Sequence, residues 1–407
     1  MAVGRTVLIG FAEAMAAIEV AWSLQEAGYN VVAFGRAGRK PALRRVRGVE
    51  IHDVPSPEDD SAAAVAEVRA LSRTLRPDAL LPLDDQALWL CRQLEEPEEQ
   101  EEDAPATIAG GIIAGGTGGA IDYALDKSLQ IRAAAEAGLP VPDTQVLDDL
   151  AAAGRVEFPV MVKPARALYD LDGALRRPTG VVCADAGELA AAAAKPWPGT
   201  LLVQPLLRGA GEGLFGHMTG HGVVGWSAHR RVRMVNPQGS ASSACRSAEV
   251  DKELVEPAER FLEAIGWRGL FMLEFLRDGS GVPWFMELNG RAWGSMALAR
   301  RRGFEYPAWT VQAALQEDVE PVPPADPPDV LCRNLGLDLV HLAFVARGPQ
   351  SQAAMDWPRL GPSVRDVCTF SRGDAVYNWK RSQPGVLAAD VLGTLRSYGS
   401  KMISRRS

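Results

Sequence analysis

The sequence predicts an α/β fold class, in which a parallel, open sheet at the N-terminus precedes a region that mixes antiparallel strands with helices, an α+β arrangement. The first observation behind this prediction is an alternation of short apolar strands with helical segments, over residues 6–10, 12–27, 31–34, 62–75 and 79–82. Such an alternation is typical of parallel sheets whose strands are joined by helical crossovers.

The second observation is a pair of apolar segments that favour antiparallel strands. Residues 270–276 and 282–288 flank Asp278-Gly279-Ser280-Gly281, and these residue types favour a tight turn, so the pair predicts a β-hairpin. Residues 213–222 and 223–233 predict another antiparallel pair. The chain after a proline-rich stretch contains at least one amphipathic helix, which predicts a mostly helical C-terminal extension.

Composition limits the classes of function. The 407 residues are enough for two to three domains, and the net charge of −8 argues against nucleic acid or an anionic membrane as the main partner. The five cysteines are scattered and include no Cys-x-x-Cys, so we expect reduced thiols in a cytoplasmic protein and no zinc site. No apolar segment is long enough to span a membrane. The sequence does not indicate an oligomeric state.

Polar side chains interrupt the otherwise apolar hairpin. If Gly279-Ser280 are the two central turn residues, Glu274 faces Phe285, and Glu287 lies one diagonal step away on the same face of the sheet. Asn289 shares that face by the two-residue period of a strand. A turn of odd length would instead put the two glutamates on opposite faces.

Two carboxylates and an amide oxygen on one face could bind a single hard cation. Mg²⁺ prefers oxygen ligands, usually one or two carboxylates together with phosphate oxygens. Arg291, two residues beyond Asn289, would supply a fork of donors for a phosphate or a carboxylate. The alternative is a structural hairpin whose charges pair with surface partners.

The spacing of these residues resembles that of a known family. Glu274, followed after a twelve-residue gap by Glu287-Leu288-Asn289-Gly290-Arg291, resembles the Glu…Glu-x-Asn-x-Arg signature that closes the ATP site of ATP-grasp ligases. The Ala-Trp-Gly-Ser that follows resembles members close to the carbamoyl-phosphate synthetase large subunit. The resemblance implies that Glu274, Glu287 and Asn289 hold magnesium on the ATP phosphates and that Arg291 contacts phosphate.

The same resemblance extends to two lysines. Lys127, which follows Asp126 at the head of a predicted helix, matches the residue that reaches the α-phosphate in the family. Lys163, in Phe158-Pro-Val-Met-Val-Lys-Pro164, matches the second nucleotide lysine. Each phosphate oxygen that leaves water needs a paired donor, which is the physical reason for both lysines.

A hinge and a lid are implied in the same way. Gln204 and Leu206 match the strand under the adenine, where backbone groups read the edge of the ring, and Glu212 matches the acidic residue that binds the ribose hydroxyls. Residues 166–180 would form the lid over the phosphates. This segment has few glycines and several arginines, so arginine side chains would replace the usual backbone cradle.

A basic strand supplies candidates for the substrate. Alternation along residues 223–233 places His229, Arg231 and Arg233 on one face. A lone histidine is more often structural than catalytic. Arg231 and Arg233 are candidates for holding a substrate carboxylate or an acyl phosphate, in the manner of related ligases; an exposed basic strand is the alternative.

The resemblance also implies a division into domains. A Rossmann-like pre-ATP-grasp domain is expected at residues 1–110, where it ends after the acidic run 95–103, and a glycine-dense segment at 113–120 is expected to be a linker. The lid subdomain (111–200) and the C-terminal subdomain (201–317) of the ATP-grasp fold follow, and then a proline-rich linker (318–330) and the helical extension (331–407).

The function implied is an ADP-forming carboxylate–amine ligase. ATP and Mg²⁺, with Mn²⁺ as a possible substitute, would be the cofactors, and a small carboxylate and an amine the substrates. A carboxylate attacks the γ-phosphate to give an acyl phosphate, and the amine then displaces phosphate. Two alternatives stay open at this point, an ATP-dependent phosphotransferase on the same fold and a non-catalytic ATP-binding regulator.

Overall fold

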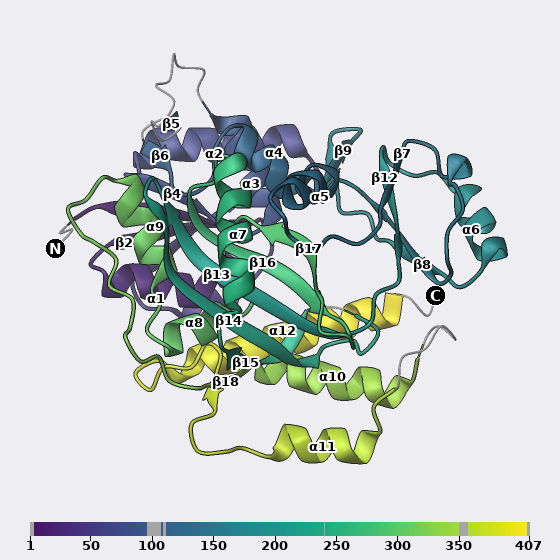
Figure 1. Ribbon diagram of the computed structural model, residues 1–407. Helices are drawn as coiled ribbons and strands as arrows, with labels where there is room; N and C mark the ends of the chain where they lie inside the picture. Colours follow the sequence, from purple (N-terminus) through teal and green to yellow (C-terminus); the bar gives the residue numbers. More distant parts are fainter. Residues whose placement is uncertain (1–3, 96–106, 109–110, 240, 350–356, 405–407) are drawn as a thin grey trace.

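The computed structural model describes residues 4–95, 107–108, 111–239, 241–349 and 357–404. It confirms the predicted α/β class: a mostly parallel sheet, a small antiparallel sheet and a large, mainly antiparallel sheet are surrounded by helices (Figure 1). Most of the acidic run 95–103 lies outside the described residues.

The first sheet has the strand order β3-β2-β1-β4-β6-β5, and all of its pairs are parallel except that of β5 with β6. Its strands are β1 (Thr6–Gly10), β2 (Asn30–Arg36), β3 (Val49–Val54), β4 (Ala79–Pro82), β5 (Thr107–Ile108) and β6 (Gly111–Ile113). The helices α1 (Ala17–Glu26), α2 (Ser61–Leu75) and α3 (Asp85–Leu94) and the 3-10 turn η1 (Ala42–Arg45) connect them. The loops after β1 to β4 therefore gather at the carboxyl edge of the sheet, where α/β proteins bind ligands.

The first sheet extends past the expected boundary at residue 110. β6 pairs with β4, and Ala114 donates its backbone N–H to the carbonyl of Leu80 at 2.8 Å. The glycine-dense segment that follows is packed and is not a free linker, because the ring of Trp267 lies where a Cβ on Gly116 would stand, at 2.3 Å.

The second sheet has the order β11-β8-β12-β7, and we call it the lid sheet. The helices α4 (Gly119–Leu125) and α5 (Lys127–Glu136) lead into it, and it contains β7 (Gln145–Leu147), β8 (Val160–Pro164), β11 (Val181–Cys183) and β12 (Leu201–Pro205). A separate hairpin, β9 (Tyr169–Leu171) and β10 (Ala174–Arg176), lies between β8 and β11 in the sequence. The lid sheet has a small hydrophobic core of its own, which the 3-10 turn η2 (Leu150–Ala152) and α6 (Ala186–Ala193) cover.

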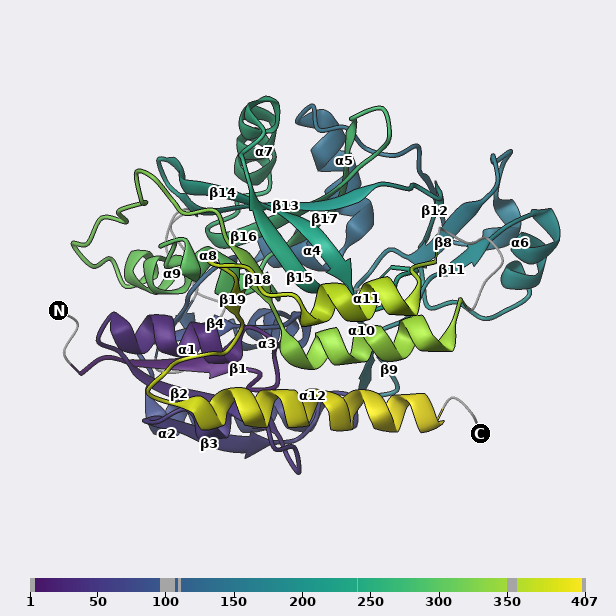
Figure 2. The ribbon, with the colours of Figure 1, turned by 90° about the horizontal axis from the view of Figure 1, so that it is seen from below.

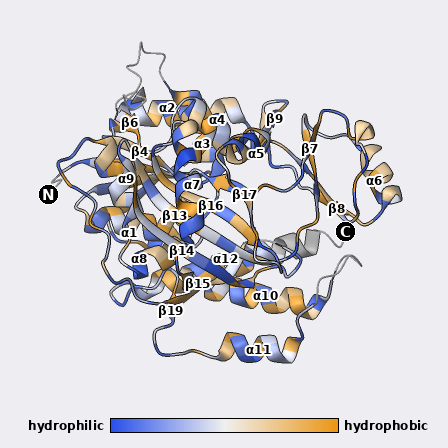
Figure 3. Ribbon diagram, viewed as in Figure 1, coloured by the Kyte–Doolittle hydropathy of each residue, from blue (hydrophilic) through white to orange (hydrophobic). Residues whose placement is uncertain are grey.

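The third sheet has the order β17-β16-β13-β14-β15-β18-β19. Its strands are β13 (Ala210–Thr219), β14 (Gly222–Met234), β15 (Ser242–Ala248), β16 (Gly269–Arg277), β17 (Pro283–Asn289), β18 (Leu331–Arg333) and β19 (Ala375–Val376). One face packs against α7 (Lys252–Ala264), which buries Phe261 and Leu262 while its charged residues face solvent (Figure 3). The other face packs against the first domain, α8 (Met296–Arg301) and α9 (Tyr306–Ala314).

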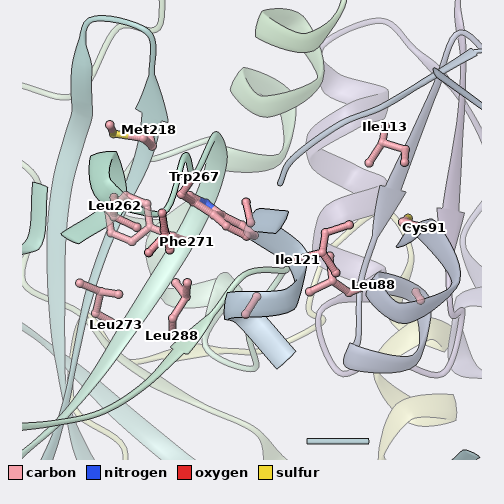
Figure 4. Close-up of a cluster of buried hydrophobic side chains, with 14 of the residues drawn as sticks. Leu88, Cys91, Ile113, Ile121, Met218, Leu262, Trp267, Phe271, Leu273 and Leu288 are labelled. Atoms are coloured by element: carbon pink, nitrogen blue, oxygen red, sulfur yellow. The ribbon is translucent and has the colours of Figure 1, made fainter. Parts of the chain in front are cut away.

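A hydrophobic cluster joins the large sheet to the first domain. Trp267 lies between Phe271, Leu262 and Leu288 on one side and Ile121 and Leu88 on the other (Figure 4). Its ring also occupies the place of a Cβ at Gly290, at 2.2 Å, so the glycine between Asn289 and Arg291 is needed for this packing.

The C-terminal extension is mostly helical, as predicted, with α10 (Leu335–Arg347), α11 (Leu360–Cys368) and α12 (Pro384–Ser404). It is not a separate unit, since β18 and β19 complete the large sheet and α12 runs beside α10 and the first domain (Figure 2). The proline-rich residues between α9 and β18 form no helix or strand, as expected for a linker. Among the described helices, none combines the length and apolarity needed to cross a membrane.

Candidate active site

The acidic hairpin β16–β17 differs from the prediction in its turn and in its register. Residues 279–281 form a three-residue loop, closed by hydrogen bonds between Asp278 and Val282 (3.0 Å) and between Gly281 and Asp278 (3.1 Å). The predicted pairing of Glu274 with Phe285 is therefore wrong, because Phe275 faces Phe285.

An irregularity further along the hairpin restores the shared face. The register shifts by one residue after Phe275, so Glu274 lies directly opposite Glu287 and Met272 opposite Asn289. A one-residue shift of register reverses which side chains share a face, so the shift compensates for the odd length of the turn. The two glutamates and Asn289 end on the same face, the one that points toward the first domain.

Glu274 is held from two sides. The guanidinium of Arg231, on β14, donates to Glu274, and the amide nitrogen of Asn289 donates to its Oε1 at 3.3 Å. Arg231 reaches across β13 because Gly211 has no side chain: a Cβ there would lie 2.5 Å from Arg231 Cδ. Burial raises the pKa of Glu274, and the pKa stays above its ordinary value even though Arg231 lowers it, because Glu287 also raises it.

Glu287 pairs with the first of the two predicted lysines. Lys127 Nζ lies 3.0 Å from Glu287 Oε2, and the backbone N–H of Lys127 donates to the carbonyl of Ala165, just beyond β8 (2.8 Å). Lys127 is the first residue of α5, after the N-cap Asp126, where the helix dipole disfavours a positive charge. Burial would raise the pKa of Glu287, but Lys127 and Lys163 hold it below its ordinary value.

Lys163, at the end of β8, has no ion-pair or hydrogen-bond partner for its ammonium in the part of the chain that the structure describes. Burial, together with the nearby positive charge of Lys127, lowers the pKa of Lys163 to about 8. A half-buried ammonium without a partner is unfavourable on its own, so the site is suited to an anionic ligand. α5, β8 and β17 meet at this point between the lid sheet and the large sheet (Figure 1).

The donor set of the hairpin suits a magnesium ion shared with a ligand. No group of three or more His, Cys, Asp or Glu side chains within the described ranges is arranged to hold a metal ion. Mg²⁺ often takes only one or two carboxylates and completes its shell with phosphate oxygens and water. The two facing glutamates fit this pattern, and Asn289, whose nitrogen bonds Glu274, keeps its amide oxygen for a cation.

Arg291 is bound to the first domain. Its Nε donates to Oδ1 of Asp85 at 2.7 Å, and its Nη1 donates to the carbonyl of Ala292 at 3.2 Å. Asp85, the first residue of α3, also accepts from Arg177 of the lid segment. Burial would raise the pKa of Asp85, but Arg291 and Arg177 hold it well below its usual range.

The residues predicted for the adenine hinge lie in the lid sheet. Gln204 is buried on β12 and donates through Nε2 to the hydroxyl of Thr144 at 2.8 Å. The backbone N–H of Leu206 donates to the carbonyl of Pro159 at 2.9 Å. The N–H of Leu206 is therefore engaged within the protein.

The structure does not bring Glu212 to the face that carries the glutamates. Gly213 faces Glu274 across the β13–β16 ladder and Glu212 faces Phe275, so Glu212 lies on the face toward α7. Its carboxylate accepts from Arg230 and from Arg277 there, at 2.9 Å each. Glu212 is one residue away from Gly213, the residue opposite Glu274, so its side chain points to the other face of the sheet.

Arg233 is also separated from the site. The β14–β15 ladder is irregular between Arg231 and Arg233, which breaks the alternation that placed both on one face. Arg233 pairs with the buried Asp338 of α10 at 2.5 Å, whereas Arg231 pairs with Glu274. His229 is buried and its Nδ1 lies 2.9 Å from the hydroxyl of Ser295; burial lowers the pKa of His229 to about 3, so it is neutral, as a structural histidine would be.

Two further patterns in the sequence point to parts of this site. Asp85 comes three residues after the end of β4, at the carboxyl edge of the parallel sheet, where ligand-binding side chains gather. Gly211 and Gly213 recur at the two-residue period of a strand, which leaves part of one face without side chains. Both patterns could have been found before the structure was known.

Comparison with known proteins agrees with this geometry. The model of a family described as "ATP-grasp in the biosynthetic pathway with Ter operon" matches residues 218–334, which include the acidic hairpin and Arg291. No curated protein matches the chain.

Solved structures with the same fold cover most of the chain. The L-amino acid ligase of Bacillus licheniformis has 17% identity and a TM-score of 0.57, over 79% of this chain and 76% of that one. N5-carboxyaminoimidazole synthetase of Staphylococcus aureus, complexed with ADP, has 15% identity and a TM-score of 0.58, over 79% of each chain. Biotin carboxylase of Campylobacter jejuni has 16% identity and a TM-score of 0.58, over 78% of this chain and 72% of that one. The family match covers the part of the chain that carries the acidic hairpin, and the solved structures show that the chain has the fold of these ATP-grasp proteins.

Proposed function

We propose that the protein is an ADP-forming ligase that activates a small carboxylate with Mg-ATP and joins it to an amine. The observation that carries the proposal is the half-buried ammonium of Lys163, which no described residue pairs with, beside the Lys127–Glu287 pair. Together with the facing glutamates, this is a site with donors for phosphate on one side and oxygen ligands for a cation on the other. Two of the compared structures, the L-amino acid ligase and N5-carboxyaminoimidazole synthetase, are of enzymes named as a ligase and a synthetase.

In this proposal each residue of the site has one task. Lys127 and Lys163 bind the phosphates and neutralise charge as the γ-phosphate is transferred. Glu274, Glu287 and Asn289 would hold magnesium, which draws negative charge from the phosphates when bound. The buried Gln204 and the carbonyl of Leu206 would form the hinge that reads the adenine. Phosphoryl transfer needs positioning and charge neutralisation more than a covalent protein group.

Arg231 and Arg291 are proposed for the transferred group and the substrate anion. A substrate carboxylate attacks the γ-phosphorus and ADP leaves, which gives an acyl phosphate; an amine then attacks the acyl carbon and inorganic phosphate leaves. Arg231 lies beside Glu274 and would contact the carboxylate or the acyl phosphate. Arg233 is left out of this proposal because it is paired with Asp338.

The proposal is tested by incubating the protein with Mg-ATP and a panel of small carboxylates and amines, singly and in pairs. A ligase releases ADP and phosphate only with a particular acid, gives a hydroxamate when hydroxylamine replaces the amine, and forms an acid–amine product. A stable phosphorylated product without any requirement for an amine would show a phosphotransferase. Tight Mg-ATP binding without turnover on any pair would favour the non-catalytic regulator.

A further inference from the structure

The carboxylate of Asp85 joins three parts of the molecule. It belongs to α3 of the first domain, and it accepts from Arg291 at the end of the acidic hairpin and from Arg177 of the lid segment. Asp85 is also close enough to influence the charge of Lys127 and Glu287 in the phosphate site. Its position is therefore next to the proposed chemistry.

Of Asp85, Arg177 and Arg291, Asp85 is the residue whose position is set by a helix. Its side chain is 11% exposed and it starts a helix whose N-cap, Asp84, accepts from the N–H of Ala87 at 2.8 Å. Arg177 is half exposed and comes from a loop. Arg291 uses Nε and Nη1 for Asp85 and Ala292, and its Nη2 has no partner within the described residues, so the carboxylate fixes the plane of the guanidinium and leaves one donor for a ligand.

The lid hairpin β9–β10 is bound to the same domain. The backbone N–H of Ser61 donates to the carbonyl of Gly173 at 2.7 Å, and its hydroxyl donates to Asp170 at 2.6 Å. Leu175 donates its N–H to Pro57, and Arg176 donates to the carbonyl of Glu58, both at 2.8 Å. The hairpin thus rests on the loop after β3 and on the start of α2, and the Arg177–Asp85 pair continues this contact toward the phosphate site.

We propose that Asp85 is a positioning residue that orients Arg291 toward the transferred phosphate and holds the lid, through Arg177, against the first domain. The inference rests on the proposed function for its catalytic part. The lid contact is independent of that function, because protein groups alone make it. Asp85 acts through the two arginines and does not touch the reacting atoms.

The test compares Asp85→Asn with Asp84→Asn, a neighbouring change that also removes one carboxylate from the start of α3 but leaves both arginines paired. Asparagine is as good an N-cap as aspartate, so the control keeps the helix. Limited proteolysis with trypsin, followed by mass spectrometry, measures cleavage after Arg176; Arg177 precedes Pro178, and trypsin does not cleave that bond. We expect Asp85→Asn to raise the rate of this cleavage by about tenfold, the equivalent of one lost charge-assisted hydrogen bond, and Asp84→Asn to leave it unchanged.

Binding of Mg-ATP and its turnover separate positioning from a merely structural role. Asp85→Asn removes a negative charge beside the phosphates, so the affinity for Mg-ATP is expected to stay equal or to increase. ATP turnover with the acid–amine pair is expected to fall about 100-fold, because Arg291 loses its orientation. A structural role would weaken binding and turnover together.

Two results would overturn the inference: lid cleavage in Asp85→Asn equal to that of Asp84→Asn, or a loss of Mg-ATP affinity as large as the loss of turnover. If Asp85→Asn does not fold, Arg177→Gln tests the lid contact at a half-exposed side chain, and unchanged cleavage after Arg176 would then reject it. Wild-type protein that fails to bind Mg-ATP would reject the proposed function, while the trypsin comparison would still decide the lid contact.

Discussion

Replacing Lys163 with methionine should weaken Mg-ATP binding and at the same time stabilise the fold. The ammonium has no partner in the described part of the chain, and burial and the charge of Lys127 bring its pKa from 10.5 to about 8. At neutral pH this shift corresponds to a cost of about 3 kcal/mol for keeping the side chain charged in the folded protein. Methionine has a similar shape and no charge, so most of this cost disappears.

We expect Lys163→Met to unfold with a free energy about 1–3 kcal/mol higher than wild type, the lower figure allowing for the part of the side chain that reaches solvent. The variant loses a charge-assisted contact to phosphate, so the dissociation constant of Mg-ATP should rise about 10- to 100-fold. Lys127→Met is the matched control: it leaves Glu287 without its 3.0 Å partner, so it should weaken Mg-ATP binding and also destabilise the fold, by about 1–3 kcal/mol.

The pH dependence of the unfolding free energy checks independently that the charge of Lys163 destabilises the fold. Because the pKa of Lys163 is lower in the folded chain (about 8) than its ordinary value of 10.5, its unfavourable contribution is fully present below pH 8. It disappears as the pH rises from 8 toward 10.5, where the unfolded chain binds more protons than the folded one. The stability advantage of Lys163→Met over wild type should therefore shrink across this range.

The assays are denaturant unfolding at several pH values and calorimetric titration with Mg-ATP. A Lys163→Met protein that is less stable than wild type at pH 7 would show that Lys163 has a structural partner. An unchanged affinity for Mg-ATP would show that the phosphates do not reach Lys163.

Three further predictions concern Glu287, Gly211 and Glu212. Glu287→Gln should abolish magnesium-dependent ATP turnover with the fold intact by circular dichroism, and retained turnover would contradict the metal assignment. Gly211→Val should displace Arg231 from its position across β13 and lower turnover about 100-fold; Gly220→Ala, where a Cβ would meet nothing within 4 Å, serves as the control. Glu212→Gln should leave the affinity for Mg-ATP within about twofold of wild type, and a larger loss in titration would restore Glu212 as the ribose ligand.

The elements of the site that could be predicted from the sequence are those that depend on local order. Lys127 follows a helix cap, Lys163 ends an apolar strand, and Glu274 and Glu287 lie in one hairpin, so their positions follow from neighbours a few residues away. The structure brings Lys127, Lys163 and Glu287 close enough for their charges to interact. The fold class was predicted for the same reason.

The register of the hairpin could not be predicted, because two local irregularities had to be known together. A three-residue loop at 279–281 and a register shift after Phe275 each reverse the face of Glu287, and their effects cancel. The shared face was therefore predicted correctly from a wrong pairing. Residue types alone do not distinguish this case from a regular two-residue turn.

The ion-pair partners of the arginines could not be predicted from the sequence, for a different reason. Arg291 and Asp85 are 206 residues apart, and Arg233 and Asp338 are 105 residues apart. Any of several carboxylates could pair with a given arginine, and the choice depends on how the domains pack. For this reason Arg233 was predicted to contact a substrate although it has a buried partner in α10.

The balance of charge in the site argues that its ligand is a strong anion. Four ion pairs of the site, taken together with Lys163, contain five cations and three carboxylates: Lys127, Lys163, Arg177, Arg231 and Arg291, with Glu274, Glu287 and Asp85. Each carboxylate already has a cation, so the excess positive charge is not neutralised within this group. Mutual repulsion of these cations opposes the closed arrangement, and a polyphosphate would relieve it. An anionic ligand is therefore expected to stabilise this group of side chains, and this is the physical reason to begin with Mg-ATP rather than with the unknown acid or amine.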